Sequence, residues 1–210
     1  MTKVKICGLS RAEDIDAANR ALPDYVGFVF APSRRRVDLR TAAMLKANLD
    51  LRIKTVGVFV NEDADAVAQI YKNSLIDLVQ LHGDEDEEYI RRLKDSCGCT
   101  VIKSVGIGDS LPALPPEKDS LIDYLIFDTI SSTAHRGGAG RAFDWGILKH
   151  YREKPYFLAG GLSQANVADA ISLLSPFCVD VSSGVETDGL KDAGKISKFV
   201  NLVKGSEFRV

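Results

Sequence analysis

The chain has 210 residues, of which 45% are apolar and 27% charged, so its composition is that of a globular protein rather than a disordered, collagen-like or coiled-coil one. Its 27 basic and 29 acidic side chains give a net charge of −2, which argues against a nucleic-acid-binding surface. No apolar run approaches the roughly 20 residues that cross a bilayer, and the first ten residues lack a signal-peptide core, so we expect no membrane partner.

Short apolar runs rich in β-branched residues recur along the chain and predict strands. We expect eight of them, at 4–7, 25–30, 55–60, 78–81, 101–105, 124–128, 156–159 and 179–182. Most of these runs are continuously apolar, as expected of parallel strands that are buried on both faces. Antiparallel strands with one wet face would alternate instead.

Helical patterns separate the predicted strands. The first begins at Ser10, which has capping-box spacing to Glu13, and runs to about Ala21. Further helices are predicted at 38–49, 61–72, 84–95, 144–151, 163–174 and 192–204. The interval 106–120 holds three prolines and therefore predicts only a short or irregular helix.

Eight strands that are each followed by a helical segment, at about 26 residues per unit, predict a (β/α)8 TIM barrel. No linker rich in Pro, Gly or Ser divides the chain, so we expect one barrel domain over residues 1–210. A doubly wound open sheet is the alternative, and periodicity alone does not exclude it.

Glycines follow the last two predicted strands, at the rim where such barrels build their active sites. Gly160 and Gly161 follow the seventh strand, and Ser183 and Gly184 follow the eighth. Glycines let backbone N–H groups approach an anion closely, so the two pairs predict a phosphorylated ligand, with tight turns as the alternative. The glycines at 137–140 suggest either a lid over a substrate or simple loop flexibility.

Two further residues at strand ends are candidates for acid–base chemistry. Cys7 ends the first strand and could act as a thiolate base, although free cysteine is often merely buried. Asp128 ends the sixth strand, where partial desolvation could keep its carboxyl protonated as an acid. A loop or capping aspartate is the alternative for Asp128.

The remaining polar residues near strand ends allow several readings. One guanidinium of Arg34–Arg36 could bind a substrate carboxylate, while the others are expected in solvent. His82 could be an imidazole of the site or a structural histidine, and the role of Asp180 stays open. Trp145 is expected to pack in the core.

Cysteine and histidine usage predicts neither a disulfide framework nor a metal site. The four cysteines are irregularly spaced, and only three histidines are present. Cys97, Cys99 and Cys178 are expected to be buried and inert. A reducing, cytoplasmic environment fits this pattern.

Nine short motifs lie at or near the predicted strand ends: KICGL at 5–9, GFVFAPSRRRV at 27–37, VGVFVN at 56–61, VQLHG at 79–83, FDT at 127–129, GGAGRAFDW at 137–145, LAGGLSQANV at 158–167, VDVSSGVE at 179–186 and GLKD at 189–192. In this order the chain resembles the phosphoribosylanthranilate isomerase family of tryptophan biosynthesis along nearly its whole length. Each motif is weak alone, and the specificity lies in their combination.

The resemblance implies a reaction. The family converts N-(5′-phosphoribosyl)anthranilate to 1-(2-carboxyphenylamino)-1-deoxyribulose 5-phosphate by an Amadori rearrangement. An acid opens the furanose ring to a Schiff base, and a base then removes the C2′ proton. The iminium serves as the electron sink, so the resemblance implies neither a metal nor an organic cofactor. The implied partner is this small-molecule substrate, and the sequence leaves a monomer or a homodimer open.

The resemblance also implies roles for individual residues. Cys7 matches the general base of the family and Asp128 its general acid. Arg36 matches the arginine that binds the anthranilate carboxylate, and Arg35 is the alternative if the register within the triplet shifts. The phosphate-binding loops match Gly160, Gly161, Ser183 and Gly184.

Two positions carry less information. His82 and the nearby Gln80 match a motif close to the site, and we include His82 among the substrate-binding candidates. The family usually has a serine or threonine where this chain has Ala139, whose side chain lacks their hydroxyl.

Other readings remain possible within the same fold. A ribulose-phosphate epimerase usually needs a His/Asp metal set, and a histidine-pathway isomerase would have an aspartate in place of Cys7. A phospho-ligand-binding protein without activity is a third reading. The presence of Cys7, Asp128 and Arg36 together argues against it.

Overall fold

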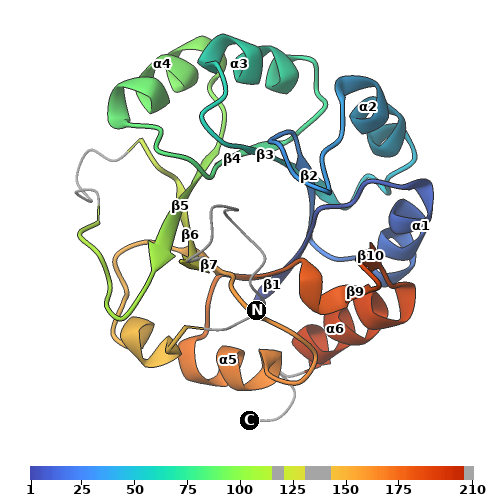
Figure 1. Cartoon of the computed structure of the whole chain (residues 1–210), viewed down its shortest axis with the longest axis vertical. Coiled ribbons are helices and arrows are strands. Elements are labelled where there is room, and N and C mark those ends of the chain that lie inside the picture. Colours follow the sequence, from blue (N-terminus) through green and yellow to red (C-terminus); the bar gives the residue numbers. More distant parts are fainter. Residues whose placement is uncertain (115–120, 131–142, 206–210) are drawn as a thin grey trace.

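Eight parallel strands close into a barrel in which each strand pairs with the next along the chain and β8 pairs with β1 (Figure 1). The computed structural model describes residues 1–114, 121–130 and 143–205. The strands are β1 (Lys3–Cys7), β2 (Tyr25–Val29), β3 (Lys54–Phe59), β4 (Leu78–Leu81), β5 (Val101–Ile107), β6 (Tyr124–Thr129), β7 (Tyr156–Leu158) and β8 (Cys178–Val181). All eight predicted strands and the barrel are confirmed, and the open sheet is excluded.

Helices surround the barrel (Figure 1). They are α1 (Ala12–Ala21), α2 (Leu39–Ala47), α3 (Ala64–Lys72), α4 (Glu87–Cys97), α5 (Val167–Leu174) and α6 (Ala193–Gly205). Each corresponds to a predicted helix. None of the helices that the structure describes is long and apolar enough to cross a membrane.

The predicted helix at 144–151 is instead a single 3-10 turn, η1 (Trp145–Leu148). Its backbone bonds run from residue i+3 to i, from Ile147 N to Asp144 O (3.2 Å) and from Lys149 N to Gly146 O (3.1 Å). The Asp144 carboxylate accepts from Gly146 N at 2.8 Å and holds this tight start. Because glycine disfavours a longer helix, the pattern overstated the element.

The start of α1 differs from the predicted capping box. The helix begins at Ala12, one residue later than Ser10 would place it as N-cap. The carboxylate that satisfies the free N–H groups belongs to Asp14, which accepts from Ser10 N (3.0 Å) and Arg11 N (3.1 Å). Glu13 was the wrong choice because it is exposed to solvent, whereas Asp14 is buried under the helix start.

The core has two parts, separated by the wall of the barrel. Between strands and helices lies a large apolar layer that includes Val4 and Ile6 of β1. A smaller apolar cluster fills the inside of the barrel. Each strand from β2 to β8 contributes a side chain to it: Tyr25, Val56, Leu78, Ile102, Ile126, Phe157 and Cys178. Residues two positions further along these strands therefore also face the barrel interior.

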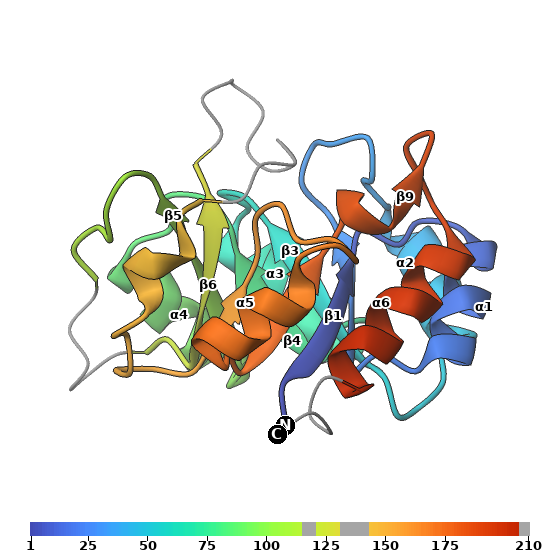
Figure 2. The same cartoon turned by 90° about the horizontal axis from the view of Figure 1, so that it is seen from below.

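A hairpin that the sequence reading missed follows β8. It consists of β9 (Glu186–Thr187) and β10 (Leu190–Lys191), which pair antiparallel. Its two-residue turn has positive φ at both Asp188 (51°) and Gly189 (80°), as a type I′ turn requires. Figure 2 shows β9 at one end of the barrel and the N-terminus at the other.

Candidate active site

The candidate site residues come together for two reasons. Alternate residues of each strand face the inside of the barrel, and closure of the barrel places the strands side by side. Lys5 pairs in register with Tyr25 and with Asp180, and Ile102 pairs with Gln80. Since Tyr25 and Ile102 line the barrel interior, these polar residues form the next layer inside it. Further toward the carboxyl ends follow Cys7, His82 and Asp128. The barrel thus changes from an apolar floor to a polar rim.

Cys7 ends β1 with its thiol directed into this rim. A side chain on Gly27, its neighbour on β2, would place a Cβ atom only 2.8 Å from the Cys7 sulfur. Glycine at this position therefore leaves the room that the sulfur occupies. Burial raises the pKa of the Cys7 thiol above its ordinary value, while Lys5 and Lys191 act in the opposite direction.

Lys5 and Asp180 form a buried ion pair directly below Cys7. The Lys5 ammonium is fully buried and lies 3.0 Å from an Asp180 carboxylate oxygen. Burial by itself disfavours the charged amine, but the Asp180 and Cys7 anions outweigh it and raise the pKa of Lys5. The open role of Asp180 is therefore that of the counter-ion to Lys5.

Asp128 lies near the end of β6, and its side chain is 20% exposed. Its Oδ1 accepts from Thr129 N at 2.8 Å, which orients the carboxyl group. Burial raises the pKa of Asp128 to about 6, and the nearby Asp180 acts in the same direction. A carboxyl that keeps its proton near neutral pH can serve as a general acid.

His82 and Gln80 extend from β4 toward Asp128. His82 Nε2 lies 3.7 Å from Asp128 Oδ2. Gln80 Nε2 lies 3.1 Å from His82 Nδ1. When the amide donates to Nδ1, the ring proton sits on Nε2, the nitrogen that faces Asp128. The structure thus places His82 beside the candidate acid.

The loops after β7 and β8 touch each other at the rim. Gly160 and Gly161 have φ of +82° and +67°, which side chains other than glycine rarely adopt. A Cβ on Gly184 would lie 2.0 Å from the Leu162 carbonyl oxygen, so only glycine allows the two loops to meet. Ser183 begins a short 3-10 turn, η2 (Ser183–Val185). The four predicted anion-binding residues therefore lie on two adjoining loops.

Only one of the three arginines after β2 is left unpaired among the described residues. Arg34 Nη2 lies 2.6 Å from Glu186 Oε2, and Arg35 Nε lies 2.7 Å from Glu186 Oε1. No hydrogen bond or ion pair joins the exposed Arg36 guanidinium to another described residue. Its backbone forms a bridge with Val29 at the end of β2, which keeps Arg36 at the rim.

The other predictions have simpler outcomes. Trp145 packs against the core as predicted, Cys99 and Cys178 are buried, and Cys97 is partly buried, with its thiol donating to the Leu93 carbonyl. The glycines at 137–140 and Ala139 lie outside the described residues, so the idea of a lid remains a prediction.

The sequence reading overlooked Glu186 and Lys191, which face each other across the hairpin, and the Lys191 ammonium lies close enough to Cys7 to act on its thiol. The signal that could have found them is the Asp-Gly pair at 188–189, a strong marker of a two-residue hairpin. Such a turn pairs Thr187 with Leu190 on either side of it, and one position further out it pairs Glu186 with Lys191.

Comparison with known proteins agrees with this geometry. The sequence model of the N-(5′-phosphoribosyl)anthranilate (PRA) isomerase family matches residues 4–202. The chain belongs to this family. The N-(5′-phosphoribosyl)anthranilate isomerase of Endomicrobium trichonymphae is 47% identical over 204 residues, covering 97% of this chain and 99% of that protein. The isomerase of Caldanaerobacter subterraneus is 48% identical over 206 residues, covering 98% and 99%.

Solved structures of family members share the fold. The phosphoribosylanthranilate isomerase of Thermotoga maritima has a TM-score of 0.83 and 34% identity, with coverage of 98% of this chain and all of that one. A second structure, of the isomerase in complex with reduced 1-(o-carboxyphenylamino)-1-deoxyribulose 5-phosphate, has a TM-score of 0.81 at 34% identity and the same coverage. A third describes monomers generated from the dimeric Thermotoga enzyme (TM-score 0.79, 33% identity, the same coverage).

The buried ion pair below the site leads to a stability prediction for this family member. Lys5→Met removes the ammonium and leaves the Asp180 carboxylate buried without its partner, so we expect a loss of about 3–5 kcal/mol in the free energy of unfolding. Urea unfolding measures it, with the exposed Lys198→Met as the control. A loss no larger than that of the control would contradict the prediction.

Proposed function

We propose that Cys7 and Asp128 carry out the reaction of the isomerase family in this chain. The reaction is the Amadori rearrangement of N-(5′-phosphoribosyl)anthranilate to 1-(2-carboxyphenylamino)-1-deoxyribulose 5-phosphate, a step of tryptophan biosynthesis. The observation that carries the assignment of roles is the pair of acid–base groups on non-adjacent strands, β1 and β6, at the same rim of the barrel. A substrate at the mouth can meet both groups, one on each side.

The proposed mechanism has two proton transfers. Asp128 in its protonated form donates to the furanose ring oxygen, and the ring opens to a Schiff base. The Cys7 thiolate then removes the C2′ proton, which the adjacent iminium makes acidic, and the enolamine tautomerises to the ketone. The electron pair of the broken C–H bond moves into the iminium. This proposal therefore includes no metal or organic cofactor.

The proposed binding groups surround these two residues. Arg36 is proposed for the anthranilate carboxylate, because Glu186 already engages Arg34 and Arg35. This argues against Arg35, the alternative left open by the sequence. The phosphate is proposed to lie against backbone N–H groups of Gly160, Gly161, Ser183 and Gly184. His82 is proposed to contact the substrate beside Asp128.

We further propose that the protein acts in the cytoplasm as one barrel domain over residues 1–210, as a monomer or homodimer. Its four free cysteines support a reducing compartment. Its proposed partner is the small-molecule substrate, with neither nucleic acid nor membrane involved.

Substrate fluorescence tests the activity and the two catalytic roles. Purified protein should consume freshly made phosphoribosylanthranilate far faster than its spontaneous breakdown, with or without EDTA. Cys7→Ser and Asp128→Asn should each lower kcat by at least about 100-fold with KM nearly unchanged, since each removes a proton-transfer group. The exposed or partly exposed Cys97→Ser and Asp169→Asn are matched controls. Wild-type turnover in either catalytic variant removes that residue from the mechanism.

The two pKa shifts predict the pH profile of kcat/KM. Turnover needs Asp128 protonated and Cys7 ionised, yet burial raises the pKa of Asp128 only to about 6 and that of Cys7 above its ordinary value. Up to about pH 6 the rate rises, because the thiolate fraction grows while Asp128 keeps its proton. Between the two pKa values, the fraction of Cys7 thiolate rises as fast as the fraction of protonated Asp128 falls, so the rate stays constant. Above the pKa of the thiol, only the loss of protonated Asp128 continues, and the rate falls.

We therefore expect a flat region that begins near pH 6 and ends above about 8.5, the ordinary thiol pKa. The residual activity of Asp128→Asn should lack the bend near pH 6 and rise continuously toward the thiol pKa. An unchanged bend in this variant would assign that limb to another group.

Arg36 provides a test of substrate binding. Arg36→Ala removes a charged hydrogen-bond donor from the carboxylate, worth roughly 1.5–3 kcal/mol, so KM should rise about 10- to 150-fold while kcat stays nearly constant. Arg40→Ala, an exposed arginine of α2, is the control. Steady-state kinetics at the pH of the flat region measures both. A KM equal to that of the control would shift the assignment to another group.

A further inference from the structure

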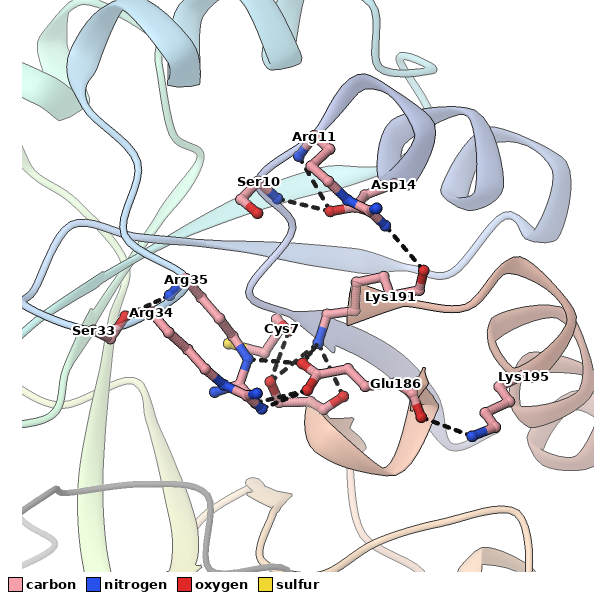
Figure 3. Close-up of polar contacts among 11 residues, drawn as sticks. Cys7, Ser10, Arg11, Asp14, Ser33, Arg34, Arg35, Glu186, Lys191 and Lys195 are labelled. Atoms are coloured by element: carbon pink, nitrogen blue, oxygen red, sulfur yellow. Dashed lines mark hydrogen bonds and ion pairs between the residues drawn. The ribbon is translucent and has the colours of Figure 1, made fainter. Parts of the chain in front are cut away.

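The hairpin after β8 carries a group of charged side chains against Cys7 (Figure 3). Glu186 on β9 and Lys191 on β10 are directly opposite each other in the antiparallel register. Their side chains meet with Lys191 Nζ 2.8 Å from Glu186 Oε1, and both are almost fully buried, at 2% and 5% exposure. Arg34 and Arg35 reach the same Glu186 carboxylate from the loop after β2.

The Lys191 ammonium has three N–H donors, and each of them has a hydrogen-bond partner. Besides Glu186, its Nζ donates to the Ser182 carbonyl (2.9 Å) and to Ser182 Oγ (3.2 Å). Ser182 Oγ donates in turn to the carbonyl oxygen of Cys7 at 3.0 Å. Two hydrogen bonds thus connect the Lys191 ammonium to the residue that carries the thiol.

The charges in this group do not balance. Three cations, Arg34, Arg35 and Lys191, share the single carboxylate of Glu186, which leaves a surplus of two positive charges. On the other side of Cys7, the ion pair of Lys5 and Asp180 is neutral overall. Arg34 is exposed to solvent, whereas the Arg35 and Lys191 side chains are largely buried. A surplus of positive charge beside a thiol favours the ionised form of that thiol, and the buried cations act on it most strongly.

Arg35 of this group packs tightly against the backbone next to Cys7. A Cβ on Gly8, the residue after Cys7, would lie 2.4 Å from Arg35 Cδ, so the arginine stem packs directly over the backbone there. Glu186 fixes the guanidinium of Arg35 with bonds of 2.7 and 3.1 Å. The hairpin and the loop after β2 therefore lie together beside Cys7. The carboxylate of Glu186 connects them by its bonds to the arginines.

We propose that Lys191 is a positioning residue for the general base: its ammonium, held by Glu186 and Ser182, stabilises the thiolate form of Cys7. The proposal rests on the proposed function for the role of Cys7 in turnover. The electrostatics agree, because Lys191 opposes the rise that burial causes in the pKa of Cys7. Burial lowers the pKa of Lys191 itself, and the Glu186 carboxylate and Cys7 act in the opposite direction. The other charged groups that face the thiol are Lys5 of β1 and Asp180 of β8.

The test is a direct titration of the Cys7 thiol in the full-length protein, without substrate. Iodoacetamide labelling is followed as a function of pH, and the modified Cys7 peptide is quantified by mass spectrometry. Lys191→Met should move the labelling midpoint upward by about one pH unit or more, because the thiolate loses a buried cation. Glu186→Gln should move it downward, because it removes the anion and leaves the cations.

Opposite shifts separate electrostatics from damage to the fold, since a loosened hairpin would change the midpoint in the same direction in both variants. Lys195→Met is the matched control: Lys195 Nζ binds the Glu186 carbonyl at 2.7 Å, so it touches the hairpin without facing the thiol. An unchanged midpoint in Lys191→Met, or equal shifts in Lys191→Met and Glu186→Gln, would overturn the proposal.

The alkaline limb of kcat/KM supplies the link to turnover. In Lys191→Met this limb should move upward together with the labelling midpoint, and Lys191→Arg, which keeps the charge, should restore part of the wild-type position. Labelling shifts in a protein without isomerase activity would refute the proposed function and leave the assignment of Lys191 intact. An alkaline limb that does not follow the labelling midpoint would overturn the role of Lys191 in turnover.

Discussion

The buried ion pair of Lys5 and Asp180 is the constraint around which the polar end of the barrel is arranged. The two residues lie 175 positions apart in the chain, and their 3.0 Å contact joins the first strand of the barrel to its last. A buried charge that has lost its hydration is stable only when it is paired, so removing either residue would leave the other as an uncompensated buried charge. The pair thus holds β1 and β8 together at the level where the apolar floor of the barrel ends.

The same pair links the two groups proposed for catalysis. Asp180 acts to raise the pKa of both Cys7 and Asp128, and Lys5 acts to lower both. Because the pair is neutral, its two effects oppose each other at each group. Desolvation then has the largest influence on both, which keeps a proton on the carboxyl to higher pH and makes the thiol reluctant to ionise. An additional cation is what the thiol needs, and the hairpin provides it in Lys191.

Close packing at glycines decides where these groups can lie. Gly27 leaves space for the Cys7 sulfur, and a Cβ on Gly160 would lie 2.4 Å from Thr129 Oγ1 and 3.1 Å from Asp128 Oδ1. Gly184 lets the loops after β7 and β8 meet at Leu162. In each case a missing side chain positions a neighbouring functional group, so these glycines belong to the site even where they touch no ligand.

The sequence by itself determined the strands, the order of the units and the residues at the strand ends. Mostly continuous apolar runs of four to six residues describe strands buried on both faces, and barrel topology then places Cys7, His82 and Asp128 at one rim. Local signals failed where two neighbouring residues, or two helix geometries, fit the same pattern. Asp14 instead of Glu13 binds the start of α1, and 144–151 tightens to a 3-10 turn.

Only the tertiary structure decided how the charged residues pair. The sequence shows three arginines in a row, whereas the fold shows that Glu186, about 150 residues away, engages Arg34 and Arg35 and leaves Arg36 at the rim. It likewise gives Asp180 its partner Lys5 and brings Lys191 to Cys7. The physical reason is that apolar periodicity is a local property of the chain, while the energy of a buried charge depends on whichever distant groups closure of the barrel places beside it.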